Sequence, residues 1–178
     1  MYNHLIADSC SLILLIKCNM LKFLVEGLKV VIPEAVLKET TGEKAAFKYP
    51  DAAIILQYVA KEKINVAAVN RQKNSLSGEF LNPLGAGERE VISLSQQLEK
   101  SLIATDDGKA IKIYRYLEIP FIISPKIVLE LYRLDKIDDK KAAAAMQKLR
   151  TIGRYSPDII AEAIYQLEET RRVKADNR

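Results

Sequence analysis

Acidic side chains follow two short apolar segments of the chain, at the points where those segments end. Asp8 comes directly after residues 4–7, and Asp106 and Asp107 adjoin the end of residues 102–105. In open α/β sheets, ligands bind outside the carboxyl ends of the strands, where the strand order reverses. If the two segments are neighbouring strands there, we expect three carboxylates to converge on one crevice.

Two glutamates on predicted helices are candidates to join this group. Glu39 lies three residues after Val36, and Glu88 lies three residues before Val91, so each shares the apolar, inward face of its helix, whereas Glu90 does not. An ionised carboxylate on an inward face costs free energy unless it is paired or coordinated. The two glutamates therefore extend the candidate site to five acids.

An acidic cluster without histidine or cysteine suits a hard divalent cation, Mg²⁺ or Mn²⁺, held by oxygen atoms alone. Such an ion lowers the pKa of a bound water and neutralises a leaving oxygen on phosphorus. Taken singly, each acid is more typical of a helix N-cap or a surface charge, and Asp106-Asp107-Gly108 is an ordinary helix start. The prediction of a metal site depends on the acids meeting at one sheet edge.

The elements that would position these acids alternate between short apolar runs and longer amphipathic segments. This alternation predicts an α/β fold with a doubly wound parallel sheet covered by helices on both faces. The predicted strands are residues 4–7, 30–32, 64–69, 102–105 and 121–123. The predicted helices are 11–28 (broken near residues 18–19), 34–41, 51–61, 87–100, 109–117, 126–134, 139–152 and 157–172, and residues 70–87 form a long loop. We expect one domain over residues 1–135, with a helical extension over 136–178 packed on it.

Composition excludes several classes of protein. A chain of 178 residues, 49% hydrophobic and 28% charged, is expected to fold as a globular protein without a membrane span or a cleaved export signal. Two cysteines cannot build a disulfide framework, which favours the cytoplasm. A single histidine leaves almost nothing for histidine-based zinc or triad chemistry.

Four segments that carry the acids resemble, in order and spacing, the PIN domain family. They read IADS at 6–9, IPEAVLKE at 32–39, LGAGEREVI at 84–92 and LIATDD at 102–107. The resemblance covers roughly residues 4–132. It implies a five-stranded parallel sheet in the order 3-2-1-4-5 and a ribonuclease that depends on Mg²⁺ or Mn²⁺. Many relatives are the toxins of toxin–antitoxin pairs, and others process or degrade RNA.

The resemblance also implies roles for individual residues. The candidate catalytic acids are Asp8, Glu39, Glu88, Asp106 and Asp107, and all but Glu39 are candidate metal ligands. Glu88 stands where the family often has Asp. Both Asp106 and Asp107 remain candidates for the fourth acid, because the family pattern Thr-x-Asp favours the second and proximity to the strand favours the first. Ser9 and Thr105 are the supporting hydroxyl residues.

Basic residues near and beyond the acids suggest an RNA path. Lys109 and Lys112 open the helix that follows the fourth strand, and Lys140 and Lys141 lie in a C-terminal region where basic residues outnumber acidic ones. Their alternative interpretation is solvated helix faces. The net charge of +4 is mild and does not decide between the two.

Two other functions compete with the nuclease. A non-catalytic RNA- or protein-binding module would keep the fold with a poor metal site. A phosphoacceptor signalling domain would place its acidic pair at the first strand and a lysine after the fifth, whereas here the pair follows the fourth strand. The expected partners are an RNA substrate, an antitoxin protein if the chain is a toxin, and a second copy of the chain, and no membrane is expected.

Overall fold

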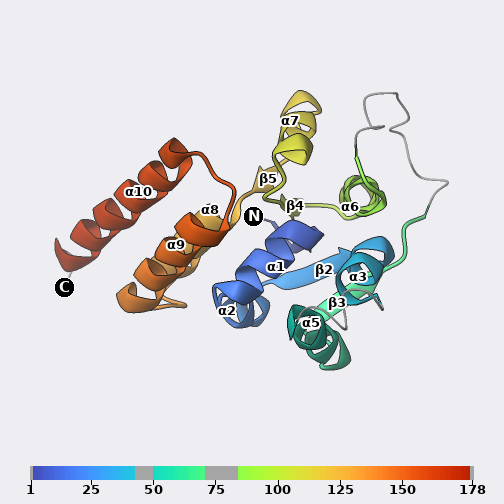
Figure 1. The fold of residues 1–178 in the computed structure, drawn as a ribbon, viewed down its shortest axis with the longest axis horizontal. Helices are drawn as coiled ribbons and strands as arrows, with labels where there is room; N and C mark the ends of the chain where they lie inside the picture. Colours follow the sequence, from blue (N-terminus) through green and yellow to red (C-terminus); the bar gives the residue numbers. More distant parts are fainter. Residues whose placement is uncertain (1, 43–49, 71–83, 177–178) are drawn as a thin grey trace.

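The computed structural model describes residues 2–42, 50–70 and 84–176. Its centre is a parallel sheet of five strands in the order β3-β2-β1-β4-β5 (Figure 1). This confirms the α/β class and the strand order that the family resemblance implies. The strands are β1 (His4–Ala7), β2 (Lys29–Pro33), β3 (Ile64–Ala67), β4 (Ser101–Ala104) and β5 (Phe121–Ile122).

The central strands are apolar after their first residue because both faces of the sheet are covered. Ile6 of β1 lies between Val31 of β2 and Ile103 of β4, and all three side chains are buried. Continuous apolar runs of this kind are typical of parallel strands with helices on both faces. The register also brings the ends of β1 and β4 level, since Ala7 pairs with Ala104.

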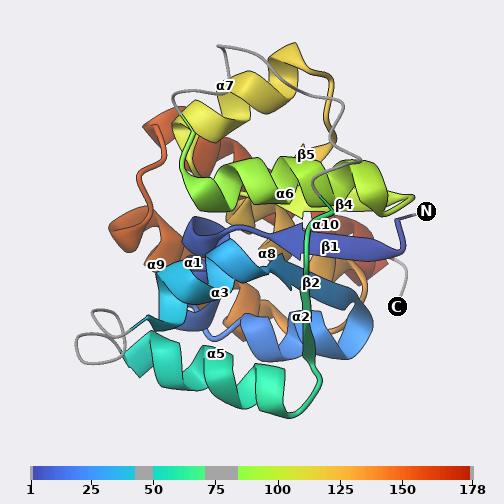
Figure 2. The same ribbon diagram turned by 90° about the vertical axis from the view of Figure 1, so that its right-hand side faces the viewer.

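Helices cover the two faces in the manner of a doubly wound fold. Because right-handed crossovers reverse direction after β3, the helices between β1 and β3 are expected on one face of the sheet and those between β3 and β5 on the other. Figure 2 shows α6 and α7 toward the β4–β5 edge of the sheet and α2 and α5 toward the β2 edge. The helices up to β5 are α1 (Ser9–Lys17), α2 (Leu21–Gly27), α3 (Glu34–Thr41), α5 (Pro50–Ala60), α6 (Ala86–Gln97) and α7 (Gly108–Tyr116).

Three helices follow the sheet: α8 (Ser124–Arg133), α9 (Asp139–Ile152) and α10 (Pro157–Asp176). They lie side by side at one flank of the molecule (Figures 1 and 2). Helix α8 is the most buried of them and also contacts α1. Since α8 runs away from the carboxyl ends of the strands, α9 returns toward them, and the turn between α9 and α10 lies on that side of the sheet.

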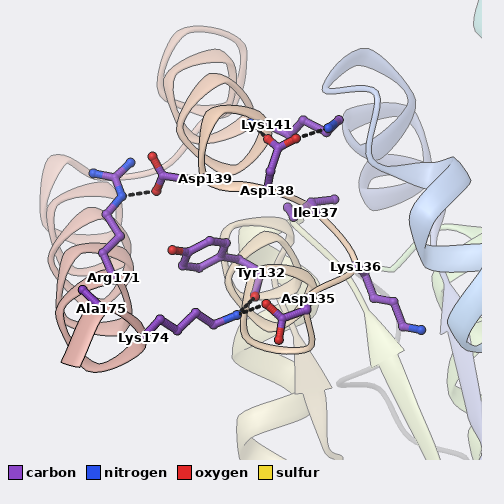
Figure 3. Close-up of a pocket in the computed structure, with 10 residues that line it drawn as sticks. All are labelled: Tyr132, Asp135, Lys136, Ile137, Asp138, Asp139, Lys141, Arg171, Lys174 and Ala175. Atoms are coloured by element: carbon purple, nitrogen blue, oxygen red, sulfur yellow. Dashed lines mark hydrogen bonds and ion pairs between the residues drawn. The ribbon is translucent and has the colours of Figure 1, made fainter. Parts of the chain in front are cut away.

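Hydrogen bonds and ion pairs join α10 to the end of α8, to the connection that follows it and to the start of α9. Lys174 donates to the Tyr132 carbonyl at 2.7 Å and to the Asp135 carboxylate at 2.5 Å, and Arg171 pairs with Asp139. These groups line a surface pocket, shown in Figure 3, whose positive charges face negative ones. The pocket is therefore lined by residues that hold the helices together, and it lies at the end of α9 remote from the α9–α10 turn.

The predicted elements agree with the structure to within a few residues. All five strands are present, and the predicted break in the first long helix falls at Asn19, whose φ of 59° ends α1 and allows α2 to begin. The predicted long loop over 70–87 lies largely outside the described residues, and its last two positions belong to α6. No helix within the described ranges is long and apolar enough to span a membrane.

Candidate active site

Asp8 stands at the carboxyl end of β1 with both of its carboxylate oxygens engaged. Its Oδ1 accepts from the Ser11 amide at 2.7 Å, and its Oδ2 accepts from the hydroxyl of Thr105, which follows β4. Both Asp8 and Thr105 are buried. Two neighbouring strands thus place a hydroxyl and a carboxylate in direct contact, as expected from the parallel register.

Burial raises the pKa of Asp8 from 3.8 to about 6. The hydrogen bonds from Thr105 and Ser11 oppose this shift, and the negative charge of Asp106 adds to it as a smaller cause. The strain of the charged site therefore comes mainly from desolvation of one carboxylate and only secondarily from repulsion between acids.

Asp106 and Asp107, which the sequence could not separate, point to different partners. Asp106 accepts from the Ser124 amide at 2.8 Å, from the Ser124 hydroxyl, and from the Tyr155 hydroxyl at 2.5 Å. Burial raises the pKa of Asp106, while these hydrogen bonds lower it. Asp107 is instead the N-cap of α7, and its Oδ1 accepts from the amides of Lys109 and Ala110 at 2.8 and 2.9 Å.

Glu39 reaches across from α3 to the beginning of α6. Its Oε1 accepts from the Gly87 amide at 2.9 Å, and its Oε2 accepts from the Ser9 hydroxyl at 2.6 Å. A Cβ atom at Gly87 would lie 2.5 Å from Oε2, so the carboxylate occupies the space that glycine leaves open. The residue as a whole is exposed, so the prediction that Glu39 faces inward is wrong. Helical periodicity gives the face on which a residue lies but not how deeply it is covered.

Glu88 is half-buried and also lies against a glycine. A Cβ atom at Gly85 would stand 2.5 Å from Oε2 of Glu88, so the carboxylate folds back over the start of its own helix. The two glycines of the segment 85–87 thus leave room for two acids. Substitution of either glycine would displace a carboxylate of the site.

A buried hydroxyl lies within the field of three of the acids. The Tyr114 hydroxyl has no hydrogen-bond partner within the part of the chain that the structure describes. Burial raises the pKa of Tyr114, and the charges of Asp8, Glu88 and Asp107 raise it further. The charges of these three carboxylates therefore act on a buried polar group that a bound water could satisfy.

Helix N-termini explain why so many acids can gather here. In a parallel fold, helices start at the carboxyl ends of the strands, where their free amides and dipoles favour negative charge. Asp8 caps α1, Asp107 caps α7, Glu39 accepts from α6, and Asp106 accepts from α8. Glu90, which periodicity placed off the apolar face, accepts from the Ala35 amide of α3 at 2.9 Å. Each of these five acids therefore accepts a hydrogen bond from the first turn of a helix.

The donor types fit a hard divalent cation, although the side chains do not surround one point. Across residues 2–42, 50–70 and 84–176, no three acidic, histidine or cysteine side chains stand close enough together to hold a metal ion as they lie. The acids offer only oxygen atoms, and one oxygen of Asp107 has no partner among the bonds described above, so the chemistry matches Mg²⁺ or Mn²⁺. Asp106 is the least suited, since three protein donors already occupy its carboxylate.

Comparison with known proteins agrees with this geometry. A family model described as a PIN domain matches residues 4–169. The chain belongs to the PIN domain family. The match extends past residue 135 and takes in α9 and most of α10, so the C-terminal helices of this PIN domain fall within the matched region. No curated protein matches the chain.

The basic residues of this PIN domain fall into two groups. Lys109 and Lys112 are exposed on α7, which begins at the acidic site. Lys140 and Lys141 lie at the start of α9, at the end remote from the site, and Lys141 is paired with Asp138. An RNA path from the site to Lys140 would have to run the length of α9, roughly 20 Å at 1.5 Å per residue.

Two site residues have no signal in the sequence that we could have used. Ser124 follows the last strand, and Tyr155 lies in the turn between α9 and α10, beyond the four sequence segments that carry the acids. Both donate to Asp106. Only the return of α9 toward the strand ends brings the tyrosine to the acids.

Proposed function

We propose that this PIN domain is an endoribonuclease that hydrolyses RNA phosphodiesters with the help of Mg²⁺ or Mn²⁺. The observation that carries the proposal is that the Thr105 hydroxyl donates to Asp8 and accepts from the amide of Asp107, so that two acids meet at the carboxyl ends of the neighbouring strands β1 and β4. Membership of the PIN domain family supports nuclease chemistry.

Under this proposal, three acids hold the cation and the neighbouring residues orient the acids. Asp8, Glu88 and Asp107 would hold the cation, which supplies Lewis acidity toward a phosphate and a water of lowered pKa. Thr105 orients Asp8 by donating to its Oδ2, while Ser9 and Gly87 hold Glu39 beside the start of α6. Attack in line with the leaving oxygen then needs no basic side chain from the protein, and the single histidine, His4, lies within β1.

Cleavage of a labelled single-stranded RNA tests the proposal. We expect wild type to cleave with Mg²⁺ or Mn²⁺ and not with a chelator, and we expect Asp8→Asn and Glu88→Gln to abolish cleavage. Asp138→Asn is the matched control, because Asp138 caps α9 away from the site. Equal cleavage by Asp8→Asn and wild type would refute the proposal.

A non-catalytic RNA- or protein-binding module is the second candidate. The observation that favours it is that the carboxylates are satisfied by protein donors and that no three of them gather as a metal site in the described segments. This function predicts that wild type binds the same RNA without cleaving it, whether or not Mn²⁺ is present. Binding and cleavage measured on one RNA therefore separate the two candidates.

A toxin role would be a specific use of the nuclease chemistry, with an antitoxin protein as partner. It predicts that expression of wild type arrests growth, that Asp8→Asn does not, and that a small DNA-binding protein encoded beside the chain relieves the arrest. Size-exclusion chromatography with light scattering would show whether a second copy of the chain is also a partner.

A further inference from the structure

A tyrosine from the C-terminal helices reaches the acidic edge of the sheet. The hydroxyl of Tyr155 donates to Oδ1 of Asp106 at 2.5 Å, across 49 residues of sequence. Tyr155 is partly buried, and its ring lies over Gly153, where a Cβ atom would collide with it. The turn between α9 and α10 is therefore folded so that one hydroxyl meets the site.

Asp106 is almost saturated by the donors that it receives. A carboxylate has about four lone-pair positions, and the Ser124 amide, the Ser124 hydroxyl and the Tyr155 hydroxyl fill three of them. Hydrogen bonds to an ionised, largely buried acceptor are strong and directional. Through these hydrogen bonds, Asp106 connects the end of β4 to the start of α8 and to the α9–α10 turn.

Asp106 lies in the chain between two residues of the candidate site. Thr105 precedes Asp106 and donates to Asp8, and Asp107 follows it and caps α7. The amide of Asp107 also donates to the Thr105 hydroxyl at 3.3 Å. The direction of the Asp106 side chain therefore determines how this segment presents Thr105 to Asp8 and Asp107 to a ligand.

We propose that Tyr155 is a positioning residue of the acidic site, acting through Asp106 on Asp8 and Asp107, so that the C-terminal helices complete the site. The inference rests on the proposed function, because a positioning role needs a reaction or a cation to position for. It adds a residue outside the four segments that resemble the family. Outer partners that orient ligands typically contribute about 10- to 100-fold to metal affinity or activity.

The variant Tyr155→Phe removes the hydroxyl and keeps the ring. Its matched control is Tyr165→Phe on α10, where an exposed tyrosine of the same helical unit loses the same atom. Two readouts are needed: the concentration of MnCl₂ that gives half of the rise in melting temperature, measured without RNA, and kcat and KM for RNA cleavage. The melting temperature with chelator reports whether each variant is folded.

We expect Tyr155→Phe to raise the half-effective Mn²⁺ concentration and to lower kcat, each by about tenfold or more, with KM for RNA nearly unchanged. Tyr165→Phe should match wild type. A Tyr155→Phe protein that melts lower with chelator but keeps the wild-type Mn²⁺ midpoint and kcat would overturn the inference, since Tyr155 would then be only a latch for the helices. Wild type that neither cleaves RNA nor responds to Mn²⁺ would instead overturn the proposed function itself.

Discussion

The buried carboxylate of Asp8 should destabilise the metal-free protein at neutral pH, and its replacement by asparagine should relieve that cost. Burial raises the pKa of Asp8 from 3.8 to about 6, so the ionised form is less stable in the folded than in the unfolded chain. The destabilisation is present above pH 6 and relaxes as the pH falls through that value. Asp8→Asn removes the charge while its amide oxygen can still accept from the Ser11 amide.

The shift of the Asp8 pKa sets the size of the effect. Ionised Asp8 lowers the free energy of unfolding by roughly 3 kcal/mol at pH 8 and by about 1.6 kcal/mol at pH 5. The Thr105 hydroxyl loses its charged acceptor in the variant, which costs about 1 kcal/mol. The free energy of unfolding of Asp8→Asn should therefore exceed that of wild type by about 2 kcal/mol at pH 8, which raises the melting temperature by roughly 4–8 °C for a chain of this size. At pH 5 the two proteins should differ little.

Thermal melts of wild type and Asp8→Asn at both pH values, with chelator and with Mn²⁺, test this reasoning. Mn²⁺ at a hundredfold excess over its dissociation constant should stabilise wild type by about 2.7 kcal/mol and the variant much less. Asp138→Asn is the control. Hydrogen bonds from Lys141 lower the pKa of Asp138, so the Asp138 carboxylate is ionised at both pH 5 and pH 8. Asp138→Asn should therefore change the melting temperature by the same amount at both pH values. If Asp8→Asn melts like wild type at pH 8, the carboxylate is not a desolvated anion and the argument fails.

Three further variants test the surroundings of the site and the proposed RNA path. Gly87→Ala should push the Glu39 carboxylate off the start of α6 and lower kcat by tenfold or more with the fold retained, as measured by RNA cleavage and circular dichroism. Thr105→Val leaves the Asp8 carboxylate with one donor fewer. The free energy of unfolding of the metal-free protein should therefore fall by roughly 1–3 kcal/mol, as measured by calorimetry. Charge reversal at Lys140 and Lys141 should leave the salt dependence of RNA affinity unchanged if these residues lie off the RNA path, whereas a reduced salt slope would place RNA along α9.

The fold was predictable because its signals are local or repeated. Apolar runs fix the strands, helical periodicity fixes the helices between them, and Pro33 and Pro120 mark where strands end or begin. The ends of elements were less accurate, since capping depends on tertiary partners. Helix α8, for example, begins two residues before the predicted start because Ser124 finds an acceptor in Asp106.

The sequence was sufficient to predict that acids collect at one edge of the sheet, but not which hydrogen bonds each acid accepts. The strand order that the family resemblance implies places Asp8 near the pair Asp106 and Asp107 without any knowledge of side chains. The contact from Tyr155 to Asp106 depends on the path of two helices, and the exposure of Glu39 depends on what packs around α3, so neither follows from spacing in the sequence. The separation of Asp106 from Asp107 likewise required the donors that each one meets.

The exchange of caps between α3 and α6 joins two distant parts of the chain into one cooperative unit. Glu39 of α3 accepts from Gly87 at the start of α6, and Glu90 of α6 accepts from Ala35 at the start of α3, across 48 and 55 residues of sequence. Opening of either helix as a whole breaks both bonds, because each helix supplies one donor and one acceptor to the other. In hydrogen exchange, the amide protons of Ala35 and Gly87 should therefore be released in the same opening event, and Glu90→Gln should speed the exchange of both.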